Sequence, residues 1–150
     1  MNIDKQKLPI LTFITHASKN RPDGEKFLVN KLKSILDVKE FIREVVIIDN
    51  QSTQPLVDKK CYQEFIKEIK TTSIRIDDQM IKGVSGAWNL GIKTSFDLGA
   101  EFVINSCDDC VLNKTIEEFV KWQIENNQRP VVTGPITDDF GTGDRLRKMS

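Results

Sequence analysis

The sequence predicts an α/β fold, with a mostly parallel sheet between two layers of helices. Apolar runs of strand length alternate with segments in which apolar residues recur at helical spacing. Several of these runs end directly on polar or acidic residues, as strands do at the binding edge of an open α/β sheet. With 150 residues the chain has the length of about one domain, and residues 1–150 are interpreted as a single unit.

The first two strands are expected at 8–15 and 44–50, where apolar residues run almost without interruption. A helix is expected between them, because its apolar residues recur at helical spacing: Phe27, Leu28, Leu32, Ile35 and Leu36. This pattern predicts a βαβ unit, whose parallel strands end at the same edge of the sheet.

The alternation continues to the end of the chain. The expected elements are a helix over 55–70, a strand over 73–76, a helix over 85–98, a strand from 102, a helix after 115 and a last strand over 130–134. Within the helix over 85–98, Trp88, Ile92 and Phe96 lie four residues apart. We expect this apolar stripe to face the core.

Two neighbouring carboxylates, Asp108 and Asp109, follow the apolar run that begins at Phe102. Carboxylate oxygens are ligands for Mg²⁺ or Mn²⁺, and such a cation can hold a diphosphate. Asp49 ends the second strand and is expected in the same crevice, where it could accept hydrogen bonds from a nucleoside base or ribose. The alternative interpretation is that these residues only form turns and helix starts.

Composition narrows the possible functions. The chain has 22 basic and 22 acidic residues and no basic tract, so we expect no nucleic-acid partner. No apolar run reaches the length of a transmembrane segment. The odd number of cysteines, three, does not suggest a disulfide framework and agrees with a reducing compartment, so the expected location is the cytoplasm.

Cys107 and Cys110 enclose the acidic pair and allow a different interpretation. A Cys-x-x-Cys pair after a strand is typical of thiol redox sites, and cysteine pairs also bind metals. A structural zinc site needs four ligands, and the sequence offers only Cys61 and His16 in addition, at no recognisable spacing. A thiol redox or metal module therefore stays as an alternative.

The chain resembles the glycosyltransferases of GT-A fold, most closely those of the family 2 type. The resemblance depends on a series of short motifs in the expected order over residues 8–135: Ile14-Thr15-His16 with Asn20-Arg21-Pro22, Ile48-Asp49-Asn50-Gln51-Ser52, Gly86-Ala87-Trp88-Asn89-Leu90-Gly91, and Asp108-Asp109. It implies a Rossmann-like, three-layer α/β/α fold that binds a nucleotide-diphosphate sugar.

The resemblance also implies roles for particular residues. Thr15 would line the base pocket, Asp49 would recognise the base, and Asp108 would approach the ribose. Asp109 would hold Mn²⁺ or Mg²⁺ on the diphosphate. His16, the only histidine, is expected near the nucleotide pocket and not as a catalyst.

The glycine-rich helix start departs from the family pattern. Trp88 stands where many relatives place an arginine before the asparagine, here Asn89, which is assigned to the nucleotide site. Lys82 could supply the cationic contact in place of that arginine. The metal motif departs as well, because position 107 is a cysteine where an Asp-x-Asp motif would begin.

The implied activity is an inverting, hexosyltransferase-like transfer from a UDP-, GDP- or dTDP-sugar to the hydroxyl of a glycan, lipid or protein. The catalytic base is not assigned, although Asp138 and Asp139 are candidates by position. Because the chain ends soon after the strand at Val131, we expect most of the acceptor-binding half to be lacking. A non-catalytic nucleotide-sugar-binding module, or a truncated glycosyltransferase, is therefore the first alternative.

Overall fold

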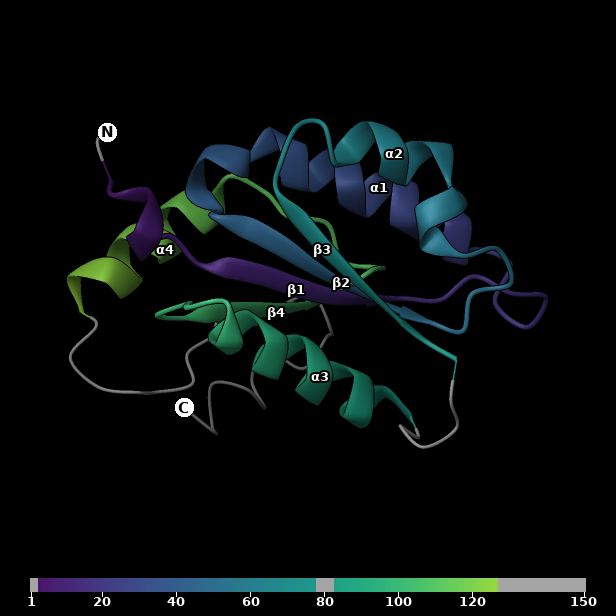
Figure 1. Cartoon of the computed structure of the whole chain (residues 1–150). Helices are drawn as coiled ribbons and strands as arrows, with labels where there is room; N and C mark the ends of the chain where they lie inside the picture. The colour runs from purple at the N-terminus through teal and green to yellow at the C-terminus, as the bar shows by residue number, and fades with distance from the viewer. Residues whose placement is uncertain (1–2, 78–82, 127–150) are drawn as a thin grey trace, which may run out of the picture.

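A computed structural model describes residues 3–77 and 83–126, which form a parallel sheet covered by helices on both faces (Figure 1). The strands of this part of the chain are β1 (Ile10–Thr15), β2 (Glu44–Asn50), β3 (Thr71–Ile76) and β4 (Val103–Cys107), in the spatial order β3-β2-β1-β4. All neighbouring strands pair in parallel. The predicted fold class, a three-layer α/β/α arrangement with a parallel sheet, is confirmed.

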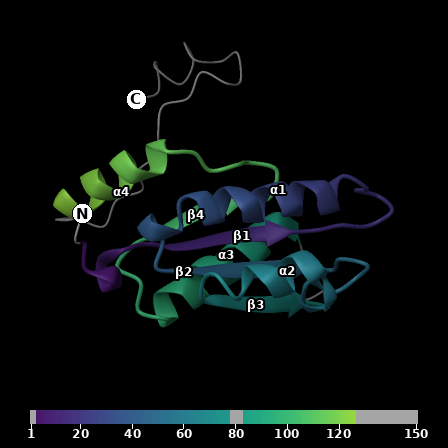
Figure 2. The same ribbon diagram turned by 90° about the horizontal axis from the view of Figure 1, so that it is seen from above.

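The chain order of the strands decides which face each helix covers. The helices are α1 (Gly24–Asp37), α2 (Lys60–Phe65), α3 (Gly83–Asp97) and α4 (Thr115–Glu125), with short 3₁₀ turns η1 (Lys5–Lys7), η2 (Lys39–Phe41) and η3 (Leu56–Asp58). The connections through α1 and α2 run in one direction across the sheet, whereas the connection through α3 runs back to β4. Because such crossovers are right-handed, α3 covers the face opposite to α1 and α2, as Figures 1 and 2 show.

Alternation along the strands divides the core into two parts. On β1, Leu11 and Phe13 pack with α1, α2 and α4, whereas Ile10 and Ile14 belong to the smaller cluster beneath α3. On β2, Val46 and Ile48 also join that smaller cluster. Successive side chains of a strand point to opposite faces, so a strand buried on both faces is largely apolar.

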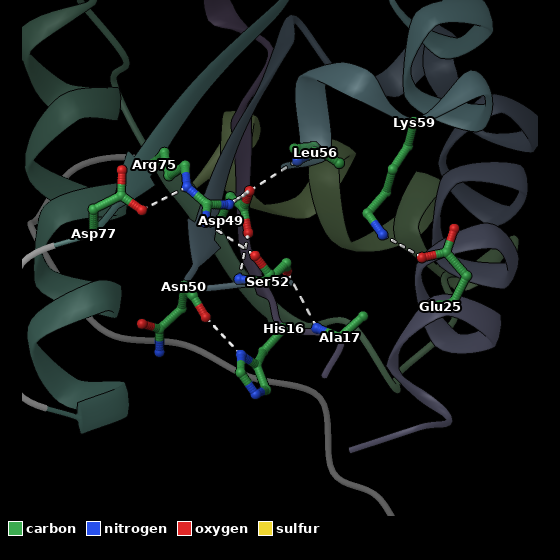
Figure 3. Close-up of polar contacts among 10 residues, drawn as sticks. All are labelled: His16, Ala17, Glu25, Asp49, Asn50, Ser52, Leu56, Lys59, Arg75 and Asp77. Carbon is green, nitrogen blue, oxygen red and sulfur yellow. Dashed lines mark hydrogen bonds and ion pairs between the residues drawn. The ribbon is translucent and has the colours of Figure 1, made fainter. Parts of the chain in front are cut away.

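The predicted helix over 55–70 is interrupted. The structure has the 3₁₀ turn η3, then Lys59 in an extended conformation, and then the short helix α2. Lys59 is buried, and its ammonium is paired with Glu25 of α1 (Figure 3). The extended conformation of Lys59 directs its side chain to the Glu25 carboxylate. The apolar residues before and after Lys59 still reach the core.

The prediction for the buried face of α3 is wrong. Ala87, Gly91 and Ser95 face the sheet, whereas Phe96 is 51% exposed. A β-carbon at Gly91 would lie 2.3 Å from the Thr12 hydroxyl, so the helix contacts β1 through its smallest side chains. The orientation of α3 follows from the close approach of its backbone to β1. The larger apolar residues of α3 lie to either side of this contact.

The start of α1 lies against the loop that leaves β1. A β-carbon at Gly24 would lie 2.1 Å from the His16 carbonyl oxygen, a backbone atom that no rotamer change can move away. We expect Gly24→Ala to lower the free energy of unfolding by about 1–3 kcal/mol, as overpacking does. Urea unfolding of this variant and of Lys26→Ala, an exposed neighbour, measures the effect. Equal stabilities for the two variants would contradict the close contact.

Some sequence predictions lie outside the described residues: the strand over 130–134 and the candidate bases Asp138 and Asp139. Among the helices of the described part, none is long and apolar enough to cross a membrane.

Candidate functional site

A pocket of about 300 Å³ lies at the carboxyl edge of the sheet, beside the start of α3. Its lining comes from the ends of β1, β2 and β4 and from α3: Ile14, His16, Arg21, Asn50, Val84, Trp88, Cys107, Asp108 and Asp109. The connection after β1 runs to β2, on the side away from β4, so the strand order β3-β2-β1-β4 reverses between β1 and β4. Such a switch point is where open α/β sheets bind their ligands.

Asp49 lies at the predicted edge of the sheet but not in the pocket. Its carboxylate is 2% exposed and accepts hydrogen bonds from the backbone N–H groups of Ser52 (3.2 Å) and Leu56 (2.8 Å). Arg75 also donates to it at 2.9 Å, while pairing with Asp77 (Figure 3). Asp49 is therefore not among the residues that line this pocket with Asp108 and Asp109; its side chain points to the other face of the sheet and holds the following loop.

Thr15 likewise points away from the pocket. It follows Ile14, which lines the pocket, and successive side chains of a strand alternate between faces. Thr15 is 1% exposed, and its hydroxyl oxygen is buried with no hydrogen-bond partner among the described residues.

The neighbours of Thr15 and Asp49 line the pocket in their place. The His16 Nδ1 lies 2.6 Å from the Asn50 carbonyl oxygen and the His16 Nε2 lies 2.9 Å from the Ser18 hydroxyl (Figure 3 shows the first contact). A carbonyl oxygen can only accept, so Nδ1 carries the proton and Nε2 accepts from Ser18. His16 thus connects the ends of β1 and β2 beside the pocket.

Asp108 and Asp109 lie in the pocket, as the sequence predicted, but in different surroundings. Asp108 is 5% exposed and forms a bidentate ion pair with Arg21, with N–O distances of 2.6 and 2.7 Å. These hydrogen bonds raise the pKa of Arg21 above its ordinary value, so the guanidinium stays charged. Asp109 is exposed to the pocket. Only Asp109 therefore offers a readily accessible carboxylate.

The other two residues that were predicted to bind the nucleotide are not among the described residues that line the pocket. Asn89 is exposed on α3 and does not belong to the lining, whereas the preceding residue, Trp88, does. Lys82 lies outside the described residues. Arg21 and Asn50 belong to the sequence motifs but had no predicted role, and both line the pocket.

A buried lysine, Lys31 of α1, holds the strand end that carries the acidic pair. Its ammonium donates to the Ser106 hydroxyl at 2.5 Å and to the Cys110 carbonyl at 2.7 Å, and it lies 5.7 Å from the centre of the Phe13 ring. Burial lowers the pKa of Lys31 from 10.5 to about 8. Helical periodicity marks position 31 as near the buried face, but it cannot show that a charge is tolerated there.

The lowered pKa of Lys31 makes a contribution to stability that depends on pH. Between about pH 8 and pH 10.5 the unfolded chain keeps a proton that the folded chain has lost, so raising the pH favours folding. We expect the free energy of unfolding of the parent, relative to Lys31→Met, to rise by about 2–3 kcal/mol across this window. Urea unfolding of both proteins at several pH values measures the difference. Parallel pH profiles would contradict the lowered pKa.

The cysteines on either side of the acidic pair are close to Asp109. One donor atom from each of Cys107, Asp109 and Cys110 lies within 4.8 Å of the other two. Burial raises the pKa of the Cys107 thiol, whereas redox-active cysteines need a lowered pKa. The arrangement therefore suits the binding of a ligand better than thiol redox chemistry.

The fold and the pocket together define a Rossmann-like α/β protein whose binding site lies at the switch point of a parallel sheet. One solved structure with the same fold is the crystal structure of residues 1–349 of TarS from S. aureus, which matches with a TM-score of 0.62 at 17% sequence identity. The match covers 86% of this chain and 39% of TarS 1–349. At the level of the fold, the resemblance to GT-A glycosyltransferases is confirmed.

Two further TarS structures contain ligands. The complex with UDP matches with a TM-score of 0.60 at 18% identity and covers 87% of this chain and 40% of TarS 1–349. The complex with UDP-GlcNAc has a TM-score of 0.61 at 18% identity, covering 87% and 38%. The chain thus spans about two fifths of these structures. No protein-family model and no curated protein matches the sequence.

Proposed function

We propose that the pocket binds a nucleotide-diphosphate sugar and that the protein takes part in transfer of the sugar to an acceptor hydroxyl. The observation that carries this proposal is the position of Asp108 and Asp109 in a pocket at the switch point of the sheet. The fold shared with TarS, crystallised with UDP and with UDP-GlcNAc, supports a uridine nucleotide as the first donor to test, before GDP- and dTDP-sugars.

The charges that line the pocket suit a diphosphate once a cation is present. Arg21 neutralises Asp108, so Asp109 is the one remaining charged side chain among the described lining residues. A single exposed carboxylate is a usual protein ligand for Mg²⁺ or Mn²⁺, because substrate phosphates supply further ligands. A divalent cation held by Asp109 would turn the net charge of the lining from negative to positive.

Strand alternation indicates which groups would contact the nucleoside. The Asn50 side chain lies on the pocket side of β2, where its amide can donate and accept hydrogen bonds with a base. Trp88 supplies an aromatic wall from α3. In this proposal Asn50 takes the role that the sequence suggested for Asp49, and Asp49 holds the loop behind it.

The chemistry proposed for the site is displacement of the diphosphate by an acceptor hydroxyl at the anomeric carbon of the sugar. A bound divalent cation would neutralise the charge that develops on the leaving diphosphate. Asp109 would hold that cation, and the Arg21–Asp108 pair would keep the strand end in position. Inversion at the anomeric carbon is the stereochemical outcome that the resemblance implies.

A second candidate function is binding of the nucleotide sugar without catalysis. It is favoured because the side chains of the lining that could act as a base already have hydrogen-bond partners. Within the described part of the pocket, Asp108 is occupied by Arg21 and both ring nitrogens of His16 have partners. Asp109 is assigned to the cation. The described lining therefore leaves no evident general base for the acceptor, whose activation contributes about 10²–10⁴-fold to rate.

An assay with radiolabelled UDP-GlcNAc, Mg²⁺ or Mn²⁺ and a mixed pool of glycan, lipid and protein acceptors separates these functions. Transfer to any acceptor supports the enzyme, and binding of UDP-GlcNAc without transfer supports the binding module. Absence of both, repeated with GDP- and dTDP-sugars, would overturn the proposal. Because the cysteines of the described structure are free, we propose the reducing cytoplasm as the location.

A further inference from the structure

The turn after β4 brings together three side chains that can each bind a metal. Cys107 is the last residue of β4, and Asp109 and Cys110 follow in the turn, which is closed by a hydrogen bond from the Cys110 N–H to the Cys107 carbonyl (3.4 Å). Their donor atoms lie within 4.8 Å of one another, and the Cys110 Sγ lies 3.7 Å from the Asp109 Oδ1.

The distance between the Cys110 Sγ and the Asp109 Oδ1 is close to that of two ligands on one tetrahedral ion. With a zinc–sulfur distance of about 2.3 Å and a zinc–oxygen distance of about 2.0 Å, tetrahedral angles place sulfur and oxygen about 3.5 Å apart. The observed sulfur–oxygen distance of 3.7 Å differs little from this value. Asp109 and Cys110 are exposed and Cys107 is half-buried, so rotation of the Asp109 and Cys110 side chains would be the main adjustment needed to bind one ion.

The donor set has the chemistry of a thiophilic cation. Two thiolates are soft ligands that select zinc and similar ions, whereas Mg²⁺ and Mn²⁺ prefer sets made only of oxygen. Asp108 is held by Arg21 through both carboxylate oxygens and does not add a further hard ligand. A hard cation would thus depend on Asp109 alone, while a thiophilic one would have three protein ligands.

With three protein ligands, a tetrahedral ion would have one coordination position left for another ligand. Three protein ligands and an open fourth position are the usual arrangement of zinc sites that bind substrate. Cys107 and Asp109 both line the pocket, so the open position would face it. The Lys31 ammonium donates a hydrogen bond to the Cys110 carbonyl and fixes the turn; with a cation bound, it would offset part of the negative charge of the two thiolates.

We propose that Cys107, Asp109 and Cys110 form a site for a thiophilic divalent cation of the Zn²⁺ class, with its open position toward the nucleotide pocket. The proposal deepens the proposed function, since a diphosphate oxygen would take the fourth position. Binding of the cation itself requires no nucleotide.

Titration of the reduced protein with Co²⁺, without nucleotide, tests the site directly. Cobalt reports thiolate ligands by charge-transfer absorption in the near ultraviolet, and Zn²⁺ should displace it. We expect this absorption in the parent and in Cys61→Ser, the control that removes a half-buried cysteine of α2. Its loss is expected in Cys107→Ser and in Cys110→Ser.

Circular dichroism shows whether the serine variants fold. If either does not, the ¹¹³Cd chemical shift of the cadmium-loaded parent reports the number of sulfur ligands, and two are expected. Absence of the charge-transfer band in the parent, its persistence in both serine variants, or a cadmium shift without sulfur would overturn the proposal. UDP binding with Mg²⁺ in a protein that lacks the cobalt band would overturn the thiolate site alone and leave the proposed function standing.

Discussion

Asp49→Asn is expected to lower the free energy of unfolding by about 2–3 kcal/mol. The Asp49 carboxylate is buried and accepts from two backbone N–H groups and from Arg75. An asparagine keeps the shape of the side chain but places an NH₂ group against one of these donors, and it removes the charge that Arg75 faces. Loss of one partner of a buried pair costs about 3–5 kcal/mol, and partial exposure of Arg75 reduces this cost.

Urea unfolding measures the effect, with Asp77→Asn as the matched control. Asp77 pairs with the same arginine, but its side chain is 73% exposed, so its replacement should change stability by less than about 0.5 kcal/mol. If Asp49→Asn kept the parental stability and lost only nucleotide binding, Asp49 would contact the nucleoside directly, and its structural assignment would be wrong.

Asp109→Asn is expected to weaken Mg²⁺-dependent UDP binding by about 100-fold or more while changing the free energy of unfolding by less than about 0.5 kcal/mol. Among the charged side chains of the described lining, Asp109 is the carboxylate that no cationic side chain holds. Its exposed position means that the substitution leaves no buried group unpaired.

Calorimetric titration of UDP with Mg²⁺ measures this affinity. Glu118→Gln, the same charge change at an exposed position of α4, is the control and should bind as the parent does. With Zn²⁺ we expect a smaller loss for Asp109→Asn, since Cys107 and Cys110 remain as ligands. Unchanged affinity of Asp109→Asn with Mg²⁺ would show that the cation binds elsewhere or is not needed.

The part of the site that the sequence predicted is the part determined by strand direction. Parallel pairing places the ends of β1, β2 and β4 at one edge, with Thr15 beside Asp49 and Ile14 beside Cys107. Apolar runs and their polar ends are visible in the sequence, so the edge and the acidic pair Asp108-Asp109 could be located.

The face of the sheet on which a side chain lies was harder to predict. β1 and β2 are buried on both faces, so their apolar residues carry no alternation that separates the pocket side from the α2 side. The sequence therefore favoured the charged Asp49 over its neighbour Asn50. The Arg21–Asp108 pair joins residues 87 positions apart and has no local signal in the sequence.

The orientation of α3 shows a second limit. Apolar periodicity favoured a stripe that includes Phe96, but contact with β1 is made through Ala87, Gly91 and Ser95. A helix that approaches a sheet this closely presents its smallest residues, and a hydrophobicity pattern gives these little weight. The same orientation places Trp88 at the pocket.

A nucleotide diphosphate bound in the pocket at the switch point would lie beside Trp88, whose indole signal can report its binding. The chain has two tryptophans: Trp88 lines the pocket, and Trp122 is exposed on α4 outside its lining. In a ¹H–¹⁵N correlation spectrum of the labelled chain, titration with UDP and Mg²⁺ should move the Trp88 indole and Asn50 side-chain amide signals. The Trp122 indole signal should stay in place. A titration that leaves the Trp88 and Asn50 signals unmoved, or that moves the Trp122 signal alone, would show that UDP does not bind in this pocket.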